Sequence, residues 1–245
     1  MKRDDLLCRA WIRQKSDGQI KAIEMAALLR QVQNILEIRA KVPRQAGTAF
    51  NIFSILNKER DEVNTHCRVL YELLNPDGSH GMGDQFLREF FSVIEQPYPG
   101  KNAVTVSREF SFPHGRIDLL IEGADFCFPI EVKIGAGDQD TQVKRYAEFA
   151  RQRAEKSRVY YLTLTGYQPS DYSTGTDSAL NLTAISFSDE IRRWLLRCGE
   201  LSWTAPSVSE IIRQYIALLD KLTGRTGEDG FVEMVRNLVG SSRAN

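Results

Sequence analysis

The amino-acid sequence predicts an α/β protein in which helices flank a mixed central sheet. Three observations lead to this prediction. Segments with apolar residues at helical spacing alternate with short runs rich in β-branched and aromatic residues. The expected order is helices, three strands, a helix, two strands and a final helix, which is typical of a mixed sheet surrounded by helices. The chain has 245 residues, 42% hydrophobic and 26% charged, so it can build one large core without disulfide or metal staples.

The N-terminal region is expected to form an amphipathic helix over residues 19–41. Its apolar residues, including Ile20, Ile23 and Ile35, recur at helical spacing, and Pro43 would end the helix. We therefore divide the chain into an N-terminal helical extension at 1–45, a main domain at 46–223 and a C-terminal tail at 224–245.

Two further helices are expected before the strands. One runs from 59 to 74 and stops at Asn75, because a residue that precedes a proline is disfavoured in a helix. The other runs from 84 to 94 and begins with Asp84, whose carboxylate is of the type that caps a helix.

The pattern changes after residue 102 to runs of strand-forming residues. Strands are expected at 103–112, 116–122, 127–133, 158–164 and 182–187. The second and third are separated by about four residues, which suits an antiparallel hairpin. Helices are expected at 138–155, 188–198 and 207–222. Asp138 and Ser188 are the expected caps of the first two of these helices, and the polar segment 166–181 is expected to be a loop.

Charged residues interrupt the two strands of the expected hairpin. Asp118 lies in the first strand, and Glu131 and Lys133 lie in the second at positions i and i+2. Because side chains alternate between the faces of a strand, Glu131 and Lys133 point to the same side. Pairing of the two strands would bring Asp118 alongside them. Apolar neighbours such as Ile117 and Val132 indicate buried strands, in which charged groups are normally paired or bound to metal.

The two carboxylates and the ammonium group point to a metal site. Carboxylates held close together repel each other, and a hard divalent cation such as Mg²⁺ relieves that repulsion. Such a cation can polarise a phosphoryl oxygen and lower the pKa of a bound water. Lys133 could then orient the attacking water and stabilise negative charge. The alternative is structural, because an Asp in a strand and a Glu-x-Lys pair on a solvated edge are both common.

Four motifs occur around these residues. They read FNIFSILNKERDEV (50–63), LLNPDGSHG (73–81), GRIDLLIE (115–122) and EVKIGAGDQDTQVKRY (131–146). With these motifs the chain resembles the PD-(D/E)XK nuclease superfamily, and more narrowly a bacterial family that carries them in this order. The resemblance covers residues 50–165. It implies a restriction-endonuclease-like αβββαβ core and a nuclease that depends on Mg²⁺ or Mn²⁺.

The resemblance also assigns roles to residues of this chain. Asp118 and Glu131 match the metal-binding carboxylates, and Lys133 matches the catalytic lysine. Glu62 matches the acidic residue that completes the site, directly or through a metal-bound water. One departure from the family pattern is Ile117, which stands where a proline often precedes the aspartate.

Four other residues are candidates for substrate binding. Gln142 and Tyr146 match a Q-x-x-x-Y motif and lie four apart on one helix face. His66 lies one turn after Glu62 and could touch a phosphate, or it is a buried histidine bonded to a neighbour. Arg116 could meet a phosphate or simply pair with Glu122 or Glu109. Glu109 itself is either a supporting acid or a solvated strand residue.

The charge balance does not exclude a nucleic-acid partner. The chain has 32 basic and 32 acidic residues, but binding depends on where charges lie rather than on their sum. Two groups of basic residues could follow a phosphate backbone, with a solvated surface as the alternative. They comprise Lys144, Arg145, Arg151, Arg153, Lys156, Arg158, Arg192, Arg193 and Arg197.

These observations predict a metal-dependent phosphodiester hydrolase with a nucleic-acid substrate. The resemblance alone favours DNA over RNA, and a homodimer is left open. One alternative is an inactive nucleic-acid- or partner-binding module on the same fold, and another is a hydrolase with an acid–base carboxylate pair, as in glycosidases. No apolar run approaches the roughly 20 residues of a membrane span, and four widely spaced cysteines are typical of reduced thiols in a cytoplasmic protein.

Overall fold

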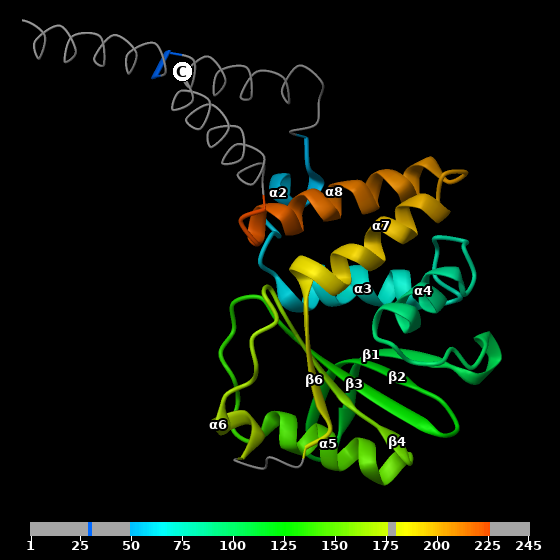
Figure 1. Cartoon of the computed structure of the whole chain (residues 1–245), viewed down its shortest axis with the longest axis vertical. Coiled ribbons are helices and arrows are strands. Elements are labelled where there is room, and N and C mark those ends of the chain that lie inside the picture. Colours follow the sequence, from blue (N-terminus) through cyan, green and yellow to red (C-terminus); the bar gives the residue numbers. More distant parts are fainter. Residues whose placement is uncertain (1–28, 31–49, 176–179, 226–245) are drawn as a thin grey trace, which may run out of the picture. The chain divides into compact units, whose positions relative to one another are not determined.

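The computed structural model describes residues 29–30, 50–175 and 180–225 (Figure 1). The chain separates into two units, Met1–Phe50 and Asn51–Asn245. Residues 29–30 of the first unit are helical. The rest of the helix expected at 19–41 lies outside the described residues, and so does the tail from residue 226 onward. No helix in the described ranges is long and apolar enough to cross a membrane.

The second unit is built on a six-stranded mixed sheet with the order β1-β2-β3-β5-β6, in which β4 also pairs with β3. The strands are β1 (Thr105–Phe112), β2 (Gly115–Glu122), β3 (Phe126–Lys133), β4 (Lys156–Ser157), β5 (Val159–Thr163) and β6 (Leu182–Ser186). The first three strands are antiparallel neighbours, whereas β3, β5 and β6 run parallel. The predicted hairpin and the predicted mixed sheet are therefore confirmed.

Helices cover both faces of this sheet (Figure 1). They are α2 (Ile52–Ile55), α3 (Cys67–Leu74), α4 (Gln85–Val93), α5 (Gln142–Arg153), α6 (Asp171–Thr174), α7 (Arg192–Leu201) and α8 (Pro206–Leu222). Single π-helical turns precede α3 and α7, namely η1 (Glu62–His66) and η3 (Phe187–Ile191), and a 3-10 turn, η2 (Lys101–Ala103), precedes β1. Figure 1 shows α3, α4, α7 and α8 on one side of the sheet and α5 on the other.

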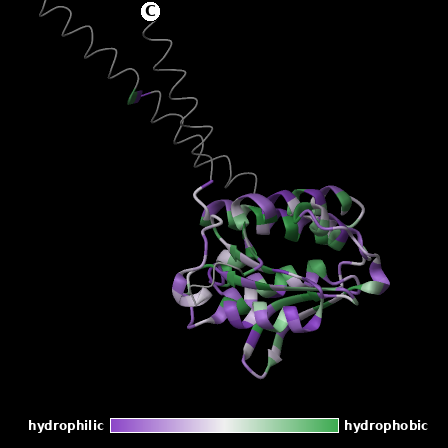
Figure 2. Cartoon of the chain, turned by 60° about the horizontal axis from the view of Figure 1, so that its bottom comes forward, coloured by the Kyte–Doolittle hydropathy of each residue, from purple (hydrophilic) through white to green (hydrophobic). Residues whose placement is uncertain are grey.

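Two apolar clusters fill the spaces between these layers. The larger joins the sheet to α3, α4, α7 and α8 and contains Trp194, whose indole N–H donates to the carbonyl of Phe86 at 2.8 Å. The smaller packs Val143 and Ala150 of α5 against Ile117 and Leu120 of β2. Figure 2 shows the hydrophobic residues on the strands and on the helix faces turned toward them. Burial of each large apolar side chain stabilises the fold by about 1.5–3 kcal/mol.

Two of the predicted helix caps are wrong, and the third holds in position only: Asp84 precedes α4, but its carboxylate makes no capping bond and accepts from the Tyr98 hydroxyl at 2.9 Å. The helix expected to start at Asp138 begins at Gln142, because the Asp138 carboxylate accepts instead from the Tyr161 hydroxyl at 2.7 Å and the Ser170 N–H at 2.8 Å. Ser188 is not a cap either, since the hydroxyl of Ser186 accepts the N–H of Asp189 at 3.0 Å. For Asp138 and Ser188, hydrogen bonds of the residues that precede the helix determine where it begins, and the spacing of apolar residues does not predict these bonds.

Candidate active site

Asp118 lies where the backbone ladder between β2 and β3 ends. The last hydrogen-bonded register pair is Leu119 with Ile130, so the next position along each strand sets Asp118 opposite Glu131. Instead of continuing the ladder, Oδ2 of Asp118 accepts the backbone N–H of Val132 at 2.9 Å. This bond turns the carboxylate toward β3 and brings the two acids into one pocket.

Glu131 and Lys133 form a buried ion pair on β3. Their charged atoms are 2.7 Å apart, and each side chain is only 3% exposed. The Lys133 ammonium also donates to Oε1 of Gln142 at 3.2 Å and to the carbonyl of Gly137 at 3.3 Å. Oε2 of Glu131 is buried without a hydrogen-bond partner in the described part of the chain. A buried carboxylate oxygen without a partner lowers the stability of the fold, so a cation or another ligand bound to this atom would remove that cost.

Glu62 reaches the same pocket from the π-helical turn η1. Its Oε1 accepts three consecutive backbone N–H groups, those of Ile134 at 2.7 Å, Gly135 at 2.8 Å and Ala136 at 2.9 Å. The carboxylate thereby fixes the turn that follows β3. Its second oxygen has no hydrogen bond among the described residues and can face a ligand.

Gln142 and Tyr146 form a buried wall of the pocket on α5. Gln142 donates from Nε2 to the Tyr146 hydroxyl at 3.2 Å and accepts from Lys133, while Tyr146 donates to the backbone carbonyl of Arg116. The two side chains are 5% and 1% exposed. These bonds favour a role in holding Lys133 and β2 in place over the predicted contact with the substrate backbone.

Arg116 and Glu109 pair at the edge of the pocket, with 3.0 Å between Nη1 and Oε2. Glu109 lies between the register pairs Arg108–Leu119 and Phe110–Ile117 and adopts a positive φ of 55°. A non-glycine residue in this conformation within a strand is strained, and such strain is frequent at functional sites. Oε1 of Glu109 is buried and unpartnered in the described region. Of the partners considered for Arg116, the structure thus selects Glu109.

His66 does not reach the pocket. The residue is fully buried; Nδ1 lies 2.9 Å from the Tyr215 hydroxyl and Nε2 lies 2.9 Å from the carbonyl of Glu59. Both ring nitrogens are occupied, and the π-helical turn directs the ring toward the core. The predicted phosphate contact is therefore not supported, and the alternative of a buried, bonded histidine fits the geometry.

We expect the buried ring of His66 to make the stability of the protein depend on pH. Burial lowers the pKa of His66 below 6.5, despite the opposing effect of the Glu59 carbonyl. Below pH 6.5 the unfolded chain therefore takes up a proton that the folded protein resists. We expect this contribution to lower the free energy of unfolding as pH falls, by at most about 1.4 kcal/mol per pH unit. Above pH 6.5 His66 is neutral in both states, and its contribution to the pH dependence of the free energy of unfolding disappears.

Chemical denaturation between pH 5 and 8 measures this effect. His66→Gln should give a flatter profile than the wild type below pH 6.5. The exposed His114 supplies the matched control, and His114→Gln should leave the profile as it is. An unchanged slope in His66→Gln would show that other groups cause the acid sensitivity.

Burial also shifts the pKa values of the charged groups in the pocket. Burial raises the pKa of Asp118 to about 6, although the Val132 N–H and Lys133 oppose the shift. Burial and the nearby Asp118 raise the pKa of Glu131 well above its ordinary value. Burial lowers the pKa of Lys133, but the carboxylates of Glu131 and Asp118 outweigh that effect and keep it raised. Burial thus disfavours the ionised form of both acids, and Lys133 offsets this effect only in part.

The pocket has a volume of about 420 Å³, and seven of the eight predicted residues line it, all except His66. Two further polar side chains, those of Gln139 and Arg145, also line it, beside Val63, Gly115, Val132 and Ala136. Gln139 was not among the residues predicted from the sequence, and Arg145 was predicted only as part of a run of basic residues. The sole signal for both was their position in the motif that follows Lys133.

The donor set of the pocket fits a hard divalent cation. It consists of carboxylate oxygens, including the unpartnered Oε2 of Glu131, and burial raises the pKa values of both Asp118 and Glu131, an effect that a bound cation would offset. Within the described ranges, no three His, Cys, Asp or Glu side chains already stand in metal-binding arrangement. Asp118 and Glu131 are therefore the direct candidates, and Glu62 is a candidate through a water.

Comparisons with known proteins support the family that the sequence motifs indicate. A model of the PD-(D/E)XK nuclease superfamily matches residues 50–217. No curated protein matches the sequence. Among solved structures, the chain is similar to a repair endonuclease from Pyrococcus abyssi, with 18% identity and a TM-score of 0.27 over 42% of this chain and 46% of that one. The chain thus spans less than half of that endonuclease, and the likeness is too weak to bear on function.

Proposed function

The chain belongs to the PD-(D/E)XK nuclease superfamily, and from this premise we propose that it is a divalent-metal-dependent nuclease that hydrolyses phosphodiester bonds. One observation carries the proposal. Asp118, Glu131 and Lys133 line a single open pocket, and a buried oxygen of Glu131 lacks any partner in the described residues. Two acids beside one fixed ammonium group suit phosphodiester hydrolysis, in which charge stabilisation and positioning provide most of the catalysis.

In this proposal Asp118 and Glu131 hold Mg²⁺ or Mn²⁺, with Glu62 completing the set through a water. The bound ion would lower the pKa of a water and neutralise charge on the phosphoryl group. Glu62 has a second task, because its Oε1 fixes the three N–H groups of residues 134–136. It therefore keeps the turn after Lys133 in one conformation while the substrate binds.

Lys133 orients the attacking water and stabilises the negative charge that develops on the phosphoryl oxygens. All three protons of its ammonium group are used in the described structure, by Glu131, Gln142 and Gly137. The substrate or the attacking water must replace one of these acceptors. The longest of the three bonds, at 3.3 Å to the Gly137 carbonyl, is the one most easily exchanged.

We propose DNA rather than RNA as the substrate on the strength of the family resemblance alone. A cytoplasmic location is a further expectation, and a homodimer is left open. The rival proposal of an inactive binding module on the same fold does not explain why Oε2 of Glu131 is buried without a hydrogen-bond partner in the described residues. The presence of Asp118, Glu131 and Lys133 together argues against that rival.

Incubation of the protein with single- and double-stranded DNA and RNA tests the proposed function. Cleavage is expected with Mg²⁺ or Mn²⁺ and should stop in EDTA. Chelation then readdition of the metal controls for damage to the protein. Tight binding without cleavage under every metal condition would contradict the nuclease and support the binding module.

A further inference from the structure

Most of the basic residues that could follow a phosphate backbone are already paired with carboxylates. On α5 and after it, Arg153 pairs with Glu122 at 3.4 Å and Lys156 pairs with Asp125 at 2.7 Å. The group on α7 is paired as well, in the ion pairs Arg192–Asp220, Arg193–Asp189 and Arg197–Glu200. These side chains therefore offer little free positive charge to a ligand.

Arg145 differs from them in position and in partners. It lies in the first turn of α5 and lines the candidate active site, together with two other basic side chains, Arg116 and Lys133. Arg116 pairs with Glu109 and Lys133 pairs with Glu131. No carboxylate of the described residues forms an ion pair with Arg145. Among the three basic side chains of this pocket, its positive charge alone is not neutralised by a carboxylate within the described part of the chain.

The guanidinium group of Arg145 is held in place but incompletely bonded. Nη1 donates to the backbone carbonyl of Asp140 and to the Thr141 hydroxyl, the latter at 3.3 Å. Nε is buried and has no hydrogen-bond partner in the described structure. Leaving a donor of a charged group unsatisfied costs free energy, and an anionic oxygen bound in the pocket could satisfy it. The planar donor fork of arginine matches the oxygens of a phosphate group.

We propose that Arg145 is a binding residue for a phosphate group of the nucleic-acid backbone. The inference rests on the proposed nuclease function, because it assigns the ligand from the substrate of that same pocket. It goes further by selecting one arginine from a run of basic residues. Asp118 and Glu131 provide carboxylates for a cation in this pocket, and Arg145 provides a group that can bind an anion.

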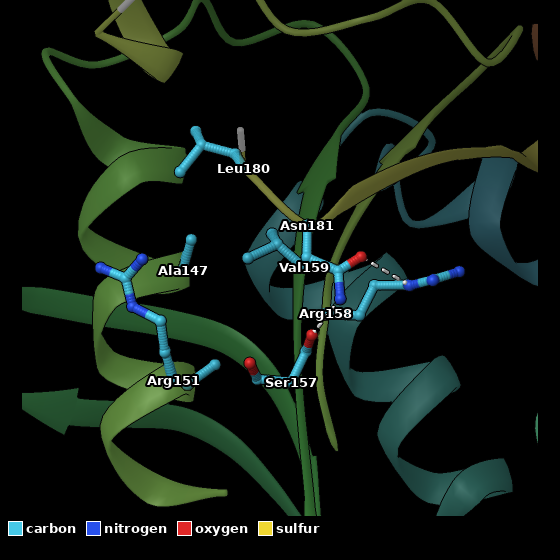
Figure 3. A pocket seen from close by; sticks show the side chains of 8 residues that line it. Ala147, Arg151, Ser157, Arg158, Val159, Leu180 and Asn181 are labelled. Atoms are coloured by element: carbon cyan, nitrogen blue, oxygen red, sulfur yellow. Dashed lines mark hydrogen bonds between the residues drawn. The ribbon is translucent and has the colours of Figure 1, made fainter. Parts of the chain in front are cut away.

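Arg151 provides a control on the same helix. It is exposed, and like Arg145 it has no carboxylate partner in the described ranges. It lines a separate pocket of about 70 Å³ with Ala147, Ser157 and Asn181 (Figure 3), and this pocket shares no lining residue with the candidate active site. Replacement of Arg151 thus removes an equal charge at a nearby position without altering the catalytic pocket.

The test measures the affinity of the full chain for labelled single- and double-stranded DNA in EDTA, at a series of KCl concentrations. Arg145→Gln should weaken binding by about tenfold at low salt and lower the slope of log K against log[KCl] by about 0.9 for duplex or 0.7 for single strands. Arg145→Lys should restore the slope but only part of the affinity, since lysine lacks the planar fork. Arg151→Gln should change both quantities much less than Arg145→Gln does, because Arg151 lies outside the candidate active site.

Several outcomes would overturn the proposal. An unchanged slope in Arg145→Gln would do so, and so would an equal loss in Arg151→Gln, which would indicate a diffuse charge effect. Thermal unfolding of each variant checks that the fold is intact. If the wild type cuts DNA with Mg²⁺ while Arg145→Gln keeps its slope, only the Arg145 proposal fails. If the slope changes but no metal supports cleavage, only the nuclease proposal fails.

Discussion

Asp118→Asn is expected to abolish metal-dependent cleavage while making the metal-free protein more stable. The loss of a metal-binding carboxylate should lower the cleavage rate by at least about 10³-fold, because transition-state charge is no longer compensated. The amide oxygen of asparagine can still accept the Val132 N–H that Asp118 accepts at 2.9 Å. The local fold is therefore expected to survive the change.

The gain in stability follows from the burial of a charge. Burial raises the pKa of Asp118 to about 6 from its ordinary value of 3.8, so the folded protein disfavours the ionised carboxylate at neutral pH. Neutral asparagine removes that penalty and should raise the free energy of unfolding in EDTA by roughly 1–3 kcal/mol. Opposite effects on activity and stability would identify Asp118 as a residue kept for function.

Urea denaturation in EDTA and cleavage assays with Mg²⁺ measure the two effects on the same preparations. Asp125→Asn is the matched control, since Asp125 lies at the other end of the hairpin and its side chain is 59% exposed in an ion pair with Lys156. This variant should retain full activity and an unchanged denaturation midpoint. Cleavage by Asp118→Asn within tenfold of the wild type would remove Asp118 from the proposed metal set.

The part of the site that lies on the hairpin was predictable because its causes are local. Alternation of side chains along β3 puts Glu131 and Lys133 on one side, and a short turn fixes the antiparallel partner. The register that pairs Leu119 with Ile130 then sets Asp118 opposite Glu131. Each step depends only on residues close together in the sequence, and so the mixed fold and the three central residues could be inferred from sequence.

The errors arise where distant residues decide the local structure. For His66 the spacing from Glu62 left a phosphate contact and a buried, bonded histidine as alternatives. The actual turn is π-helical, and Tyr215, 149 positions away, supplies the hydrogen bond that favours the second. Asp138 fits the pattern of a helix cap, yet Tyr161 and Ser170 occupy its carboxylate. No periodicity in the sequence encodes such partners.

The special position of Arg145 was hidden for the same reason. In the sequence it is one of six basic residues between 144 and 158, and nothing distinguishes it from Arg153 or Lys156. The carboxylates that neutralise those two residues, Glu122 and Asp125, lie about 30 positions earlier on the β2–β3 hairpin. Which charge remains free is therefore a property of the folded chain.

Lys133→Met is expected to lower both cleavage and stability. Loss of the ammonium group removes the stabilisation of the attacked phosphate, and we expect a fall of about 10²–10⁴-fold in the cleavage rate. It also leaves Glu131 buried without its partner at 2.7 Å. Removal of one member of a buried ion pair destabilises a protein by about 3 kcal/mol or more, which urea denaturation should detect as a lower midpoint.

The chain contains a second lysine–carboxylate pair of the same length, which serves as the control. Lys156 and Asp125 are also 2.7 Å apart, but their side chains are 65% and 59% exposed. Water screens such a pair, so Lys156→Met should leave both stability and cleavage unchanged. Equal destabilisation by the two variants would show that burial of the Lys133–Glu131 pair has no energetic consequence.

The double variant Glu131→Leu, Lys133→Met separates stability from function at this pair. Two apolar residues in place of a buried ion pair are often neutral or stabilising, because neither charge has to be desolvated. The double variant should therefore regain most of the stability that Lys133→Met loses, and it should remain without cleavage activity. Recovery of stability without recovery of activity would mean that the pair is retained for its chemistry, because apolar side chains at these positions would hold β3 in the sheet equally well.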